Sequence, residues 1–129
     1  MLASEMITRL TSETVDAAMQ ESAPVLVGCL FRDRNFALNL VSLELTAMFF
    51  QGELKVYYVL EDMHLYFQKR FGITGTPTYI MTQAGHALGT LLGRVSPGKL
   101  IEHVTEMMMD RRKQTLRTLL QVNKLQKEQ

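Results

Sequence analysis

Apolar and polar positions along the chain follow two patterns, one typical of strands and one typical of helices. Two nearly continuous apolar runs, 24–31 and 54–60, predict strands that are buried on both faces. Three shorter runs, 6–10, 78–82 and 87–92, also predict strands. We expect the first of these at an edge of the sheet, and the last two as an antiparallel hairpin.

Apolar residues at helical spacing predict a helix after each of the first two strands. The threonine and serine residues in 11–14 favour a helix start, and 21–24 ends that helix. The second helix follows the 24–31 strand and is expected to end at 51–53. We expect its buried face to contain these residues: Phe36, Leu38, Leu40, Leu43, Leu45, Ala47 and Met48.

Two further helices are indicated by their end signals. Asp62 is expected to cap a short helix over 63–71 that Gly72 ends. Ser96 and Pro97 have the residue types that favour a helix cap and a first helical position. The predicted order is therefore β-α-β-α-β-α-β-β-α, an α/β protein with a central mixed sheet flanked by helices.

The last predicted helix is long. From Pro97 the chain stays compatible with a helix to about Lys127, and the polar run 109–114 is a candidate hinge or exposed turn. We therefore divide the chain into a domain over 1–108 and a C-terminal helical extension over 109–129.

Leucines at 116, 119 and 120 form a separate apolar stripe in that extension. An isolated helix of this length is only marginally stable, so the stripe needs a partner or the segment is disordered. Three alternatives follow: Leu116, Leu119 and Leu120 dock on their own domain, pair with a second copy of the chain, or belong to a disordered tail.

Composition narrows the class of protein. The 129 residues suit one domain, and a net charge of +1 gives no bulk field that would attract nucleic acid or anionic lipid. The apolar runs are too short to span a membrane. We therefore expect no nucleic-acid or membrane partner. The N-terminal segment does not read as a signal peptide, so the expected location is cytoplasmic, or periplasmic if a leader has been removed.

Few residues offer reactive chemistry. The three histidines, His64, His86 and His103, are too dispersed for a metal site, and we expect no metal and no other cofactor. Cys29 is the only cysteine, so no internal disulfide is expected. Because it lies within an apolar run, we expect a buried, unreactive side chain. The alternative is a single redox thiol.

The most specific motif is the segment 72–80, in which Pro77 stands between two threonines at the start of a strand. Proline has no N–H to donate and is normally confined to strand starts and edges. An X-Pro bond is also the common place for a cis peptide.

The strand 24–27, the segment 71–78 and the hairpin and helix start at 83–100 resemble, in this order, elements of thioredoxin-like proteins. The resemblance covers about residues 5–108 and implies a thioredoxin fold with a cis Thr76–Pro77 bond. It places Arg34 and Ala37 where the family has its two cysteines, and Gly28 where it has a buried acid. Thiol–disulfide exchange needs a reactive thiolate, so the resemblance implies a scaffold without that chemistry.

The same resemblance implies a groove that binds polypeptide without turnover. Its candidate residues are Arg34, Asn35, Phe36, Gly75, Thr76 and Pro77. For Arg34, a solvated loop charge is the alternative. We expect a non-catalytic interaction, chaperone-like or assembly module, which is the role of the hydrogenase-maturation thioredoxin-like proteins. The alternatives are a thiol oxidoreductase that uses Cys29 alone, and a structural subunit that self-associates through Leu116, Leu119 and Leu120.

Overall fold

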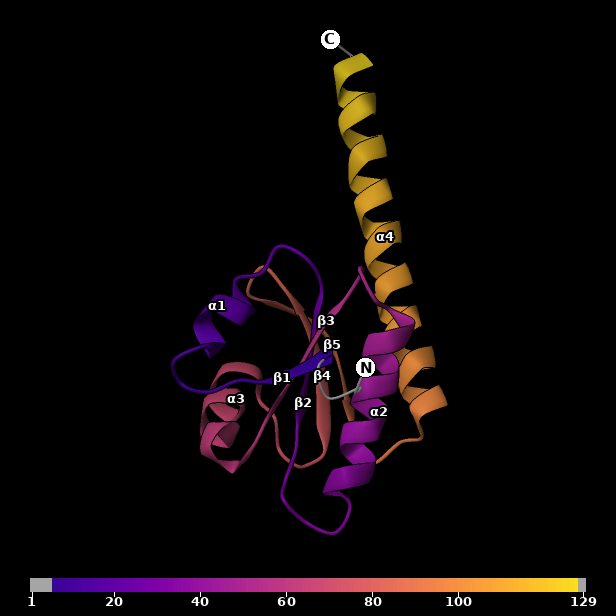
Figure 1. Cartoon of the computed structure of the whole chain (residues 1–129). Helices are drawn as coiled ribbons and strands as arrows, with labels where there is room; N and C mark the ends of the chain where they lie inside the picture. The colour runs from indigo at the N-terminus through magenta and orange to yellow at the C-terminus, as the bar shows by residue number, and fades with distance from the viewer. Residues whose placement is uncertain (1–5, 128–129) are drawn as a thin grey trace.

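A computed structural model describes residues 6–127 and shows a mixed five-stranded sheet with helices on both faces (Figure 1). Its strands are β1 (Ile7–Arg9), β2 (Val25–Cys29), β3 (Lys55–Val59), β4 (Thr78–Gln83) and β5 (His86–Leu92), in the spatial order β1-β3-β2-β4-β5. The pairs β1–β3 and β3–β2 are parallel, whereas β2–β4 and β4–β5 are antiparallel. The predicted mixed α/β class is confirmed, and β1 lies at an edge.

The helices form two layers. They are α1 (Val15–Met19), α2 (Phe36–Phe49), α3 (His64–Phe71) and α4 (Pro97–Lys127), with a short 3-10 turn, η2 (Glu61–Met63), before α3. In Figure 1, α1 and α3 cover one face of the sheet, and α2 and α4 cover the other. Residues 1–5 and 128–129 of the two predicted domains lie outside the described residues.

The central strand β2 supplies side chains to both layers. Val25, Val27 and Cys29 are buried in the cluster formed with α1 and α3, whereas Leu26 belongs to the cluster formed with α2 and α4. Alternate residues of a strand point to opposite faces, which explains this division. The apolar run predicted a strand buried on both faces, and the structure confirms it.

The face of α2 differs from the prediction. Leu43 and Ala47 are buried, and Phe36 and Leu40 pack against the same cluster. However, Leu38, Leu45 and Met48 are 61%, 40% and 49% exposed, so their predicted burial was wrong.

Polar residues of α2 take the inward positions instead. Asn39, Ser42 and Thr46 are all buried. The Thr46 hydroxyl donates to the Ser42 carbonyl at 2.7 Å, and the Ser42 hydroxyl donates to the Leu38 carbonyl at 3.3 Å. Hydroxyls that donate to the preceding helical turn can be buried at little cost. A pattern that classes every serine and threonine as exposed therefore predicts the wrong buried face for this helix.

The predicted helix ends are mostly confirmed. Gly72 ends α3 in the left-handed conformation, with φ of 71°. The Ser96 hydroxyl accepts a hydrogen bond from the Lys99 N–H at 3.2 Å, as a cap of α4 should. The predicted cap by Asp62 was wrong. Its carboxylate instead accepts a hydrogen bond from Arg9 at 3.2 Å, which ties η2 to β1.

Helix α4 continues well past the sheet (Figure 1). Residues 109–114 are helical, so the candidate hinge was wrong; none of them breaks a helix. Burial on α4 ends at Met108. Beyond it, Arg111 contacts Gln83, and Arg112 pairs with Glu53 at 3.5 Å.

The leucines of the extension lie beyond those contacts. Leu116, Leu119 and Leu120 are 56–59% exposed, so the alternative in which they dock on their own domain was wrong. The segment is helical rather than a disordered tail as far as Lys127. No helix between residues 6 and 127 is both long enough and apolar enough to cross a membrane.

Candidate functional site

The segment 74–77, called here the proline loop, connects α3 to β4. The Thr76–Pro77 bond is cis, as predicted. The Pro77 carbonyl accepts a hydrogen bond from the Gly93 N–H at 2.9 Å, and the Thr78 hydroxyl donates to the Gly75 carbonyl. These bonds tie the loop to the end of β5 and to the start of β4.

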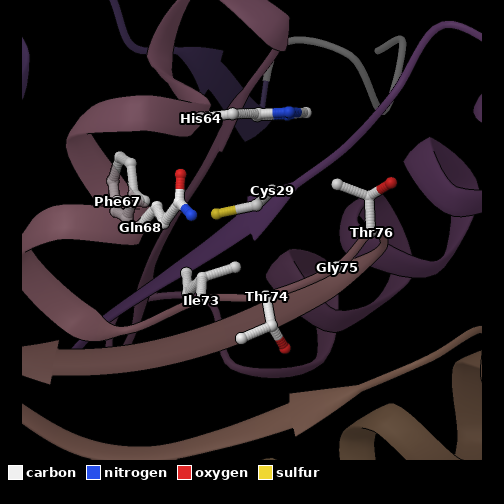
Figure 2. A pocket seen from close by; sticks show the side chains of 8 residues that line it. All are labelled: Cys29, His64, Phe67, Gln68, Ile73, Thr74, Gly75 and Thr76. Carbon is white, nitrogen blue, oxygen red and sulfur yellow. The ribbon is translucent and has the colours of Figure 1, made fainter.

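A cavity of about 150 Å³ lies beside the proline loop (Figure 2). Its walls come from the end of β2, from one side of α3 and from the loop itself. The lining residues are Cys29, His64, Phe67, Gln68, Ile73, Thr74, Gly75 and Thr76. The cavity therefore combines an apolar wall with polar groups near the loop.

Cys29 ends β2, and its side chain lies among the residues that line this cavity (Figure 2). Only 1% of the residue is exposed, which confirms the predicted burial. Burial removes the thiolate from water and raises the pKa of Cys29 to about 12. At neutral pH the group is therefore a protonated thiol, which is a weak nucleophile.

Three lining residues come from one face of α3. Phe67 and Gln68 lie three and four residues after His64, so all three share that face. Nε2 of His64 lies 2.8 Å from the Leu30 carbonyl, and the tautomer with hydrogen on Nε2 donates to it. The sequence pattern excluded His64 as a metal ligand and indicated no other role for it. The spacing of His64, Phe67 and Gln68 along the predicted helix was the signal that could have identified them as one wall of a cavity.

The loop before α2 is held by side-chain contacts. The Arg32 N–H donates to the Glu61 carboxylate at 2.8 Å, and this bond lowers the pKa of Glu61. Nη1 of Arg94 donates to the Asn35 side-chain oxygen at 2.8 Å. Phe36 faces Tyr58, with 6.4 Å between the ring centroids. Arg34 is exposed.

The predicted binding residues therefore fall into two groups. Gly75 and Thr76 line the cavity, with Pro77 next to them in the chain. Arg34, Asn35 and Phe36 are at the start of α2 and, within the part of the chain that the structure describes, do not line it. The two groups flank the carboxyl end of β2 from different layers of the fold.

The cavity presents one thiol, an apolar wall and several hydrogen-bonding side chains. The cavity holds one thiol, and the sequence provides no second cysteine for a disulfide. Among residues 6–127, no group of three or more His, Cys, Asp or Glu side chains is placed to hold a metal ion. Phe67 and Ile73 can receive an apolar group, while Gln68 and Thr74 can hydrogen bond to its polar neighbours.

The chain matches no protein-family model, and a search of curated proteins gives no significant match.

Proposed function

We propose that this protein has a thioredoxin fold and binds polypeptide at the proline loop and its cavity, without thiol–disulfide exchange. The fold assignment is supported by the central position of β2, the β4–β5 hairpin and the proline loop that precedes β4. The absence of exchange is supported by Arg34 and Ala37, which stand where the family has its cysteines.

The observation that carries the binding proposal is the cavity itself. A volume of about 150 Å³ suits a single side chain, whereas cofactors and drug-sized ligands need roughly 300 Å³ or more. A chain segment passing the proline loop can place one apolar side chain against Phe67 and Ile73. Backbone groups of the loop then supply hydrogen bonds, as in other sites that bind extended peptides.

The experiment is a binding titration. A reduced, carboxymethylated and therefore unfolded protein is labelled with a fluorophore and titrated with the full-length chain. We expect saturable binding that Thr74→Arg weakens about 10-fold or more, because the new side chain obstructs the cavity mouth. The matched control is Thr118→Arg, which alters an exposed threonine on α4 and should bind like the wild type. Equal loss in both variants, or no binding at all, contradicts the proposal.

A second candidate function is an oxidoreductase that uses Cys29 alone. Its support is the position of the thiol among the residues lining the cavity, next to the proline loop. Burial and the raised pKa of Cys29 oppose it. An insulin-reduction assay separates the two functions: turnover that disappears in Cys29→Ser would favour the enzyme, whereas no turnover above the uncatalysed rate would favour binding alone.

A further inference from the structure

One face of α4 changes the sign of its charge halfway along the helix. Exposed residues 3, 4 or 7 apart share a helix face, and after Lys99, which pairs with Glu102 at 3.8 Å, this face carries three acids followed by three bases. They are Glu102, Glu106, Asp110, Lys113, Arg117 and Lys124. The first half of the face is therefore acidic and the second half is basic.

Within a single helix this order places like charges four residues apart, although Lys99–Glu102 and Asp110–Lys113 are opposite charges three residues apart. Glu102 and Glu106 are four residues apart, as are Lys113 and Arg117, and like charges at that spacing repel. The helix dipole favours acids at the start and bases at the end, but its effect is confined to the first and last turns. It does not explain a change of sign between Asp110 and Lys113.

An apolar seam runs beside the charged face. It consists of Met109, Leu116, Leu119 and Leu120, all of them exposed. Arg112 lies on the same side of the helix and pairs with Glu53, which follows the end of α2. The seam is therefore on the side of α4 that borders α2.

Helix α2 also exposes an apolar row. Its members are Leu38, Val41, Leu45, Met48 and Phe49. Because α2 and α4 lie side by side (Figure 1), the row and the seam belong to neighbouring helices. Exposed apolar patches of this extent usually mark an interaction surface.

We propose that α4 pairs antiparallel with α4 of a second copy, about a twofold axis near Arg112. Asp110 and Glu106 then face Lys113 and Arg117, because these residues lie on either side of Arg112 at distances that match within one residue. In this register Lys124 lies opposite Lys99, which pairs with Glu102 of its own chain. Asp110 and Lys113 are two and one residues away, Glu106 and Arg117 are six and five, and Glu102 and Lys124 are ten and twelve. The twofold axis makes every such contact occur twice.

The apolar surfaces fit the same arrangement. Leu116 of one copy lies opposite Met109 of the other, and the rest of the seam runs along the partner's α4 beside its α2 row. A parallel pair would instead place acids against acids and bases against bases. A membrane is less favoured as the occupant, because the acidic half would repel anionic lipid and 97–127 contains no aromatic residue to anchor it.

Light scattering on the full-length chain over a range of concentrations tests the pairing. We expect the wild type to be dimeric. Lys113→Glu/Arg117→Glu/Lys124→Glu makes the face acidic from Glu102 onward, and Glu102→Lys/Glu106→Lys/Asp110→Lys makes it wholly basic. Each variant alone should be monomeric, with its dimer Kd raised about 100-fold, and an equimolar mixture should form a heterodimer.

Controls make each outcome decisive. Circular dichroism establishes that the variants retain their helices. As a charge-matched control, Lys69→Glu on α3 should leave the dimer unchanged, whereas Arg117→Glu on α4 should weaken it. A monomeric wild type, a dimer unaffected by both triple variants, or a mixture that stays monomeric overturns the proposal. A monomeric wild type that binds phosphatidylserine vesicles overturns it in favour of a membrane.

Discussion

Leu43 of α2 fills the space beside Gly28 of β2. A Cβ added to Gly28 would lie 2.6 Å from Cδ1 of Leu43, and Leu43 is fully buried. Gly28 stands where the resemblance to thioredoxin-like proteins places a buried acid that transfers protons. In this protein that space holds a leucine side chain, so the position has neither a carboxylate nor room for one.

Gly28→Ala should destabilise the protein by about 1–3 kcal/mol, because an added methyl group forces Leu43 to move in a packed core. Urea unfolding at a fixed protein concentration measures the change. The control is Gly98→Ala in the first turn of α4, where a Cβ meets nothing within 4 Å. That substitution should be neutral or stabilising by up to about 1 kcal/mol. Equal effects of the two substitutions would contradict the packing described.

Cys29 should resist thiol reagents in the folded protein, because its sulfur is buried and protonated at neutral pH. Reaction with a chromogenic disulfide reagent at neutral pH measures the accessibility of the Cys29 sulfur. We expect no labelling on the timescale on which Gln51→Cys, which adds an exposed second thiol, reacts with one equivalent. In denaturant, both cysteines should react. Rapid labelling of the native wild type would show that the thiol is accessible.

The raised pKa of Cys29 also predicts a loss of stability at alkaline pH. Between its ordinary pKa of 9.0 and about 12, the unfolded chain loses the thiol proton while the folded chain keeps it. The free energy of unfolding therefore falls as pH rises through this window, by up to about 1.4 kcal/mol per pH unit from this group. In Cys29→Ala the free energy of unfolding should fall less steeply than in the wild type between pH 9 and about 11. If the free energy of unfolding fell equally with pH in both proteins, the Cys29 thiol would not be the group responsible.

The contact between Arg9 and Asp62 can be separated from a helix cap by a double-mutant cycle. If Asp62 acts through Arg9, then Arg9→Ala and Asp62→Ala should be non-additive, with a coupling energy of about 0.2–1 kcal/mol for this exposed pair. Additive effects would instead indicate that Asp62 stabilises α3 by itself. Thermal unfolding of the four proteins in low salt provides the comparison.

Features set by local sequence were predictable. The strand runs, Gly72, the Ser96 cap and the Thr76–Pro77 bond all depend on residues close to them in the chain. The errors concern features that depend on distant partners. Asp62 has the residue type of a cap, but its partner is Arg9, 53 positions away. On α2, burial of Ser42 and Thr46 depends on hydroxyls bonding within the helix, which a pattern of apolar and polar letters does not record.

The candidate site was predicted only in part for the same reason. Gly75 and Thr76 belong to a recognisable motif, and the structure places both in the wall of the cavity. The opposite wall is provided by His64, Phe67 and Gln68, whose position depends on how α3 packs against the end of β2. The spacing of these residues puts them on one face of α3, but no local signal turns that face towards Cys29 at the end of β2.

We propose that this protein binds polypeptide at the proline loop and that its thiol takes no part. The most direct measurement is amide NMR of the full-length chain during titration with the carboxymethylated unfolded protein, in the wild type and in Cys29→Ala. We expect shifts concentrated in residues 73–78 and on the cavity face of α3, with equal affinity in both proteins. Shifts that avoid this region, or binding that disappears in Cys29→Ala, would contradict it.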